Sequence, residues 1–196
     1  MYNEDNYLIV GLGNPGREYR ETRHNVGFML LDRLAGRMNS SFSRVEAKAL
    51  FTRGDYAGHR LLLAKPQTYM NLSGQAVGSL AQYYKVSTEK ILIAYDDVDL
   101  PLSNLRLRAS GGSGGHRGMN SIIERLGTQD FPRLRIGIGR QPGRMEAADY
   151  VLQVFSKDEI DLLSESLDRG VEAVLTFVTK GISAAMNQFN PAPGDL

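Results

Sequence analysis

The chain has 196 residues, enough for one well-packed domain, and its 42% hydrophobic and 23% charged residues are ordinary for a globular protein. It contains no cysteine, which excludes disulfides and thiolate metal sites. The net charge is only +1, but residues 103–144 hold eight arginines against two acids, a net +6, and residues 145–196 are net −6. Such a basic segment can present a positive face to an anionic partner; scattered, solvated arginines are the alternative.

The N-terminus, Met1 to Asn6, is polar and acidic and has no signal-peptide pattern. No apolar run approaches the roughly 20 residues that span a bilayer. We therefore expect a cytoplasmic protein with no membrane partner.

Strands and helices alternate along the sequence. Short apolar runs predict strands at 7–10, 49–56, 60–64, 90–95, 105–109 and 134–138, with a hairpin turn at 57–59. Helical spacing predicts helices at 26–38, 73–84 and 119–126, a long helix opened by a capping box at 156–159, and a last helix at 182–189. No linker divides the chain. We expect an α/β fold, a single domain over residues 1–196, with a twisted mixed β-sheet flanked by helices on both faces and a frayed tail at 190–196.

A glycine-rich turn, Gly11-Leu12-Gly13-Asn14-Pro15-Gly16, follows the first strand, and His24 comes ten residues after Asn14. Open α/β sheets bind ligands at such strand ends. The glycine spacing also matches a dinucleotide fingerprint. That interpretation is disfavoured, because the next helix leads into a hairpin instead of a second parallel strand ending in an acid. Pro15 also removes a backbone donor from the turn.

Asn71 and Ser73 lie where the second helix is predicted to begin. Helix N-capping is the favoured role for either residue. The alternative is that Asn71 points its amide at a bound carbonyl or water.

Asp96, Asp97 and Asp99 follow an apolar strand and could bind a metal, orient a histidine or lie in solvent. Calcium is disfavoured, because the glycine and the terminal glutamate of a calcium loop are absent. With His24 at another strand end, an Asp–His pair is chemically sensible, since the carboxylate would fix the imidazole tautomer and raise its basicity.

Five glycines in residues 111–118 predict a loop that ends at a helix start and is flanked by arginines. The loop lacks the P-loop pattern. It is either a flexible surface linker or, as the basic residues favour, an anion-facing gate. No cysteine exists and no serine lies in a nucleophile elbow, so direct activation of water by His24 is the economical chemistry. The basic segment suggests a phosphate-bearing substrate.

Six ordered blocks closely resemble bacterial-type peptidyl-tRNA hydrolases and together cover about residues 7–190. They are Gly11-Leu12-Gly13-Asn14-Pro15-Gly16 with Tyr19, Thr22-Arg23-His24-Asn25 with Gly27, Tyr69-Met70-Asn71-Leu72-Ser73-Gly74, Asp96 with Asp99-Leu100-Pro101, Gly114-Gly115-His116 with Gly118, and Leu134-Arg135-Ile136-Gly137-Ile138-Gly139.

The resemblance implies a monomeric enzyme, without cofactor or metal, that cleaves the ester joining a peptide to the terminal ribose of tRNA. It implies His24 as the general base, Asp96 as its stabilising partner, Asn14 as a contact to the peptide, and Asn71 as a group that positions the carbonyl or water.

For the tRNA, the resemblance implies Tyr19 and Tyr69 at the 3′ end and Arg108 and Arg135 on phosphate. His116 matches the family, whereas Arg117 replaces an asparagine that normally helps hold the tRNA end. Two alternative functions are a non-catalytic tRNA-binding module and a nucleotide-cofactor enzyme that uses the glycine turn.

Overall fold

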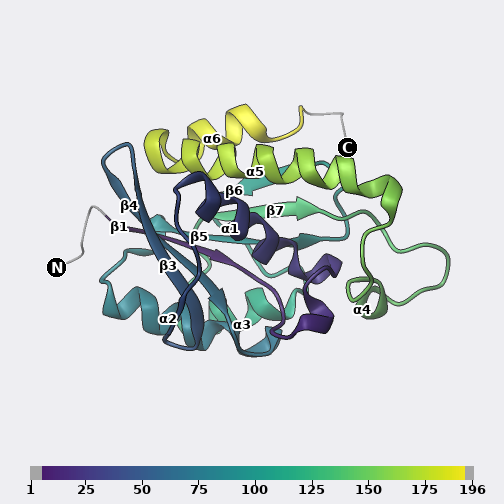
Figure 1. Ribbon diagram of the computed structural model, residues 1–196, viewed down its shortest axis with the longest axis horizontal. Helices are drawn as coiled ribbons and strands as arrows, with labels where there is room; N and C mark the ends of the chain where they lie inside the picture. The colour runs from purple at the N-terminus through teal and green to yellow at the C-terminus, as the bar shows by residue number, and fades with distance from the viewer. Residues whose placement is uncertain (1–5, 193–196) are drawn as a thin grey trace.

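The computed structural model describes residues 6–192 and contains one seven-stranded mixed sheet in the order β2-β3-β4-β1-β5-β7-β6 (Figure 1). The central strands β4, β1, β5 and β7 are parallel, and the edges are antiparallel. The strands are β1 (Asn6–Gly11), β2 (Arg44–Glu46), β3 (Ala49–Tyr56), β4 (His59–Pro66), β5 (Ile91–Asp97), β6 (Leu105–Arg108) and β7 (Arg133–Gly137).

Helices cover both faces of the sheet, which confirms the predicted layers (Figure 1). On one face lie α1 (Val26–Arg37), α5 (Ile160–Lys180) and α6 (Ile182–Phe189), and on the other lie α2 (Ser73–Tyr83) and α3 (Arg117–Leu126). The short helix α4 (Ala147–Tyr150) precedes α5. The single-turn 3₁₀ helices are η1 (Arg17–Tyr19), η2 (Arg23–Asn25), η3 (Met70–Leu72), η4 (Thr88–Lys90) and η5 (Lys157–Glu159). No helix within residues 6–192 is both long and apolar enough to cross a bilayer.

The predicted hairpin joins β3 to β4 through Ala57 and Gly58, both at positive φ, as a two-residue turn requires. The predicted capping box is confirmed, because the backbone N–H of Ser156 donates to Glu159 Oε2 over 2.7 Å. Strand β2 was not predicted, since its three mostly polar residues show no apolar run.

Several predicted boundaries differ from the structure by one or two residues. Helix α3 begins at Arg117, two residues before the prediction, because the side chain of His116 caps it. Asn190, the first residue of the expected frayed tail, is hydrogen-bonded: its Oδ1 accepts from the backbone N–H of Leu107, and its Nδ2 donates to the carbonyl of the same residue. The last four residues of that expected tail, 193–196, lie outside the described residues.

The glycine turn serves close packing between β1 and α1. A Cβ on Gly11 would lie 2.1 Å from the carbonyl oxygen of Gly27, and one on Gly13 would lie 2.8 Å from the ring of Phe28. Helix α1 starts only after η1 and η2, so no helix begins at the glycine turn as a dinucleotide site requires. The turn therefore packs the N-terminal end of α1 against the carboxyl ends of β1 and β5.

Candidate active site

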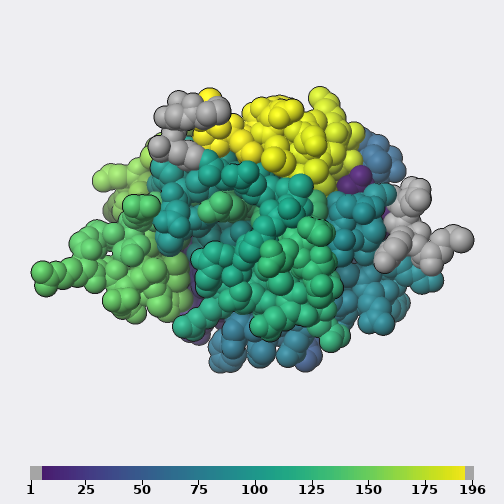
Figure 2. All heavy atoms as spheres, turned by 180° about the vertical axis from the view of Figure 1, so that it is seen from behind, coloured from purple at the N-terminus to yellow at the C-terminus, as the bar shows by residue number. Residues whose placement is uncertain are grey.

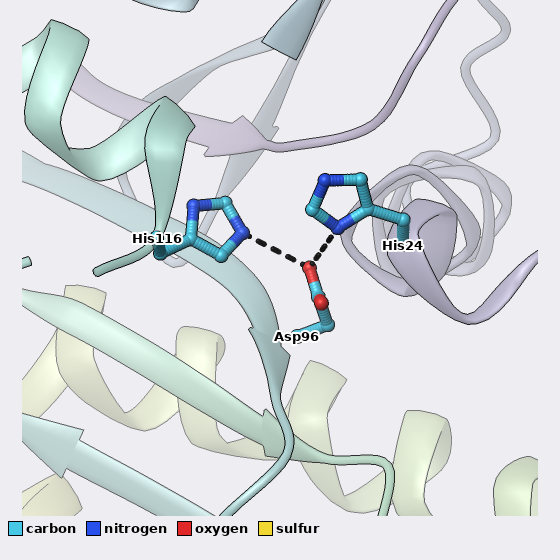
Figure 3. Close-up of side chains that lie close together, drawn as sticks. All are labelled: His24, Asp96 and His116. Carbon is cyan, nitrogen blue, oxygen red and sulfur yellow. Dashed lines mark hydrogen bonds and ion pairs between the residues drawn. The ribbon is translucent and has the colours of Figure 1, made fainter. Parts of the chain in front are cut away.

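Three side chains meet at the carboxyl end of β5. His24 comes from η2, Asp96 from β5, and His116 from the position just before α3 (Figure 3). His24 Nδ1 lies 2.9 Å and His116 Nε2 lies 3.0 Å from the same oxygen, Asp96 Oδ1. Their side chains are 14%, 3% and 9% exposed for His24, Asp96 and His116. The predicted Asp–His pair is present, and His116 joins it.

Hydrogen bonding fixes the tautomer of both imidazoles. The backbone N–H of Met119 donates to His116 Nδ1 over 3.3 Å, so this nitrogen has no proton and Nε2 donates to Asp96. An ionised carboxylate only accepts, so His24 Nδ1 also donates to Asp96. His24 Nε2 is left with a free lone pair and can take a proton from water.

Asp96 remains ionised although it is buried. Burial by itself would raise the pKa of this carboxyl, but the neighbouring imidazoles of His116 and His24, and their hydrogen bonds, outweigh it and hold the pKa well below its ordinary value. A carboxylate that stays ionised at neutral pH orients His24 and stabilises the imidazolium that forms when His24 acts as a base.

His24, Asp96 and His116 also form a potential metal-ligand set, since their ligand atoms all lie within 4.8 Å of one another. The hydrogen bonds argue against this use. A metal on His116 Nε2 would require a proton on Nδ1, where Met119 already donates. A metal on His24 Nδ1 would place the proton on Nε2 and remove the base. The cluster fits metal-free acid–base chemistry better.

Asn14 is held in one orientation beside this cluster. Its Oδ1 accepts from the backbone N–H of Met70 over 3.0 Å, which leaves the Nδ2 hydrogens as donors. Asn25 is buried and binds the backbone of Asn14 in both directions, with its Oδ1 accepting from Asn14 N and its Nδ2 donating to Asn14 O, each over 2.9 Å. The sequence predicts no role for Asn25, although it lies in one of the six blocks that resemble the family.

The favoured capping role of Asn71 and Ser73 is wrong. Leu72 occupies the N-cap position of α2 without a side-chain bond, and Ser73 Oγ donates back to the carbonyl of Met70. Asn71 lies in η3, is exposed, and its side chain makes no hydrogen bond to residues 6–192. Its amide is therefore available to a ligand. Tyr69, two residues earlier, is 69% exposed.

Arginines share one face of the β6–β7 pair. Arg106 lies opposite Arg135 and Arg108 opposite Arg133 in the antiparallel register, so all four side chains point to the α2–α3 side of the sheet. Burial, followed by the charges of Arg108 and Arg135, lowers the pKa of Arg106. We call Arg106, Arg108 and Arg135 the arginine face.

Carboxylates and backbone carbonyls already bind some of the arginines in this region. Arg135 Nε donates to Asp97 Oδ2, so Arg135, a predicted phosphate contact, already forms an ion pair within the protein. Arg133 is buried and donates to the carbonyls of Gly112, Gln129 and Phe131, so it supports the glycine loop from inside. Asp99 is exposed and lies 3.4 Å from Arg140, which makes it the solvent-facing member of the three carboxylates.

Arg117 and Tyr19 are the remaining predicted tRNA contacts. Arg117 is the first residue of α3, is exposed, and forms no ion pair within the described part of the chain. Tyr19 ends η1 and is half-buried, and its carbonyl accepts from the backbone and hydroxyl of Thr22. Figure 2 shows a hollow between the light-green projection near residues 140–155 and the teal-to-green bulk, with purple atoms of the N-terminal region in it.

Comparison with known sequences identifies the relatives of this chain. A family model described as peptidyl-tRNA hydrolase matches residues 8–195. The chain is 53% identical to the peptidyl-tRNA hydrolase of Chloroflexus aggregans over 186 residues, 94% of this chain and 99% of that protein. It is 49% identical to the chloroplastic peptidyl-tRNA hydrolase of Arabidopsis thaliana, covering 94% of this chain and 64% of that one.

The fold also matches solved structures. The crystal structure of peptidyl-tRNA hydrolase from Acinetobacter baumannii superposes with a TM-score of 0.89, at 37% identity and 97% coverage of both chains. The predicted mixed-sheet α/β fold and the resemblance drawn from the six sequence blocks are confirmed.

Proposed function

The chain belongs to the peptidyl-tRNA hydrolase family, and we propose that it hydrolyses peptidyl-tRNA with a water molecule activated by His24. The observation that supports this most directly is the 2.9 Å contact between His24 Nδ1 and Asp96 Oδ1, which leaves Nε2 free as the base. His116 Nε2 donates to the same carboxylate oxygen and helps to hold it in place.

The reaction requires one water and no redox partner. His24 Nε2 takes a proton from water while the water oxygen attacks the ester carbonyl carbon, and negative charge develops on the carbonyl oxygen. The Asn71 amide is the group we assign to that oxygen. When the intermediate collapses, the bond between the acyl carbon and the ribose oxygen breaks, and the imidazolium of His24 returns the proton to the ribose.

Asn14 supports selection of N-blocked substrates. Its free Nδ2 hydrogens suit the carbonyl of a peptide or N-acyl group, whereas the free ammonium of an aminoacyl-tRNA offers only donors and a charge. We expect Asn14→Ala to narrow the ratio of kcat/KM between N-acetyl-aminoacyl-tRNA and aminoacyl-tRNA. An unchanged ratio would remove Asn14 from peptide recognition.

For the tRNA, we assign Tyr19, Tyr69, His116 and Arg117 to the region of the 3′ end and Arg108 and Arg135 to phosphate. Arg117 can offer a charged contact where the family has an asparagine. The variant Arg117→Asn tests this contact. If Arg117 binds a phosphate, the slope of the logarithm of the binding constant against the logarithm of the salt concentration should become shallower by about one. A monomeric state and a cytoplasmic location are parts of the same proposal, and sedimentation of the purified chain tests the first.

The experiment that tests the function is release of the N-acetyl-aminoacyl group from tRNA by the purified chain. Ester release supports the hydrolase. Binding without release would favour the non-catalytic tRNA-binding module. The nucleotide-cofactor alternative is not favoured, because Gly11 and Gly13 pack against Gly27 and Phe28.

A further inference from the structure

Arg23 is a buried cation next to the proposed base, and the function described so far does not use it. The residue is 6% exposed. Its Nη1 lies 3.0 Å from Glu159 Oε1 and its Nη2 lies 2.7 Å from Glu159 Oε2, a two-point contact. The guanidinium carbon lies 4.5 Å from the ring centre of Tyr150 and 4.7 Å from that of Phe155.

The backbone around Arg23 is fixed by the same segment of the chain. The N–H of Arg23 donates to the carbonyl of Gln153 over 2.9 Å, and the N–H of His24 donates to the carbonyl of Val151 over 2.8 Å. Thr22 forms an isolated antiparallel bridge with Val154. The turn that holds His24 therefore rests on residues 151–154.

A closed ring of bonds joins this turn to the strand of Asp96. Arg23 Nη1 donates to the carbonyl of Ile138 over 3.3 Å, and the N–H of Ile138 donates to the carbonyl of Asp97 over 3.1 Å. Asp97 follows Asp96 in the chain, and Arg23 precedes His24. The contact between His24 Nδ1 and Asp96 Oδ1 completes the ring.

The ion pair between Arg23 and Glu159 is better suited to fixing the geometry of the site than to stabilising the fold. A buried ion pair is often no more stable than apolar residues of similar volume, because desolvation offsets the attraction. A guanidinium bound at two points by a carboxylate, and also by a carbonyl, does fix a geometry. By contrast, the pair Arg33–Asp168 has side chains that are 36% and 69% exposed and bears on no catalytic group.

We propose that Arg23, held by Glu159, is a positioning residue that fixes the imidazole of His24 against the carboxylate of Asp96. The inference rests on the proposed role of His24 as the base. A displacement of about 1 Å at a catalytic group can cost on the order of a hundredfold in rate.

The first test variant is Glu159→Gln, with Asp168→Asn as the matched control at the exposed pair. We expect kcat for N-acetyl-aminoacyl-tRNA to fall by about tenfold or more, with KM changed by less than about twofold. The low-field proton signal of His24 Nδ1–H should broaden in the variant and stay sharp in the control. A wild-type kcat with an unchanged proton signal in Glu159→Gln would overturn the inference.

The double variant Arg23→Met with Glu159→Leu separates positioning from folding. Removing both charges leaves no uncompensated ion, so the chain should fold with stability close to the wild type even if Glu159→Gln does not. We expect its kcat to remain about tenfold or more below that of the wild type. Full kcat in this folded variant would overturn the inference. A wild-type chain that releases no ester would instead overturn the proposed function.

Discussion

The proposed catalytic cluster of His24, Asp96 and His116 and the arginine face lie at neighbouring strands of the sheet but are built in opposite ways. His24, Asp96 and His116 are nearly buried, and their tautomers are set by contacts within the protein. The arginine face is more open, and within residues 6–192 one of its three guanidinium groups, that of Arg135, forms an ion pair, with Asp97. The cluster has its hydrogen bonds formed before any substrate binds, whereas the arginine face keeps positive charge available to an anionic ligand.

The difference matches the work that each region would do. A base must be held close to its final geometry, because misplacement lowers the rate of the chemical step. Contacts to phosphate release counterions and supply affinity, and they tolerate movement of a long side chain. We therefore expect changes in the cluster to lower kcat and changes in the arginine face to raise KM.

The largest expected effect is at the base. His24→Ala removes the only imidazole with a free nitrogen in the cluster, so turnover should fall by at least about a thousandfold while tRNA binding is retained. Ester release and tRNA binding measured side by side check this. His59→Ala, on the β3–β4 hairpin, is the matched control and should keep its activity. Full turnover in His24→Ala would exclude His24 as the base.

The second largest effect is expected for Asp96→Asn. Its kcat should fall by about a hundredfold, because a neutral amide stabilises the imidazolium of His24 poorly. Asp99→Asn, at the exposed neighbour, should leave kcat unchanged.

The lowered pKa of Asp96 also predicts a pH effect on stability. The ionised carboxylate stabilises the fold above its unfolded pKa of about 3.9, and this contribution is lost as the pH falls through the lower folded pKa. Urea unfolding should therefore show a deficit for Asp96→Asn at pH 7 that shrinks in strong acid. A pH-independent deficit would contradict the ionised state.

The double variant Arg108→Ala with Arg135→Ala should raise KM and leave kcat unchanged. The slope of log KM against log salt concentration should fall by about one for each arginine removed, because each removes one phosphate contact. Arg53→Ala with Arg60→Ala changes two arginines of the β3–β4 hairpin and is the control. An unaltered salt slope would exclude Arg108 and Arg135 from the tRNA contact.

The smallest expected effect is at the ion pair within the arginine face. Asp97→Asn releases Arg135 from its carboxylate partner, so KM at low salt should fall by about two- to threefold. Since Asp97 follows Asp96 directly, a loss of kcat in this variant would show that the two regions are not separable.

Most of the fold could be predicted from the sequence, because continuous apolar runs mark buried strands such as β1 and β5, and helical spacing of apolar residues marks long helices such as α5. Strand β2 is short and mostly polar, so it forms only through its pairing with β3. The start of α3 was missed for a local reason, since histidine is an unusual N-cap and His116 is selected by its simultaneous contact with Asp96.

The site was predictable where the chemistry of two side chains suggests that they pair, and not where packing alone brings the partners together. The pairing of His24 with Asp96 was predicted from the chemistry of an Asp–His pair, although His24 lies in η2 and not at a strand end as expected. The contacts of Arg23 with Glu159, across 136 positions, and of Asn14 with Met70, across 56, depend on tertiary packing that no local pattern encodes.

The most direct test of the division between the two regions is single-turnover ester release with enzyme in large excess over N-acetyl-aminoacyl-tRNA. At saturation, the variant Arg108→Ala with Arg135→Ala should regain the wild-type rate, because only binding was weakened, and Asp96→Asn should remain slow by about a hundredfold. An arginine variant that stays slow at saturation, or an Asp96→Asn variant that recovers the wild-type rate, would contradict the account.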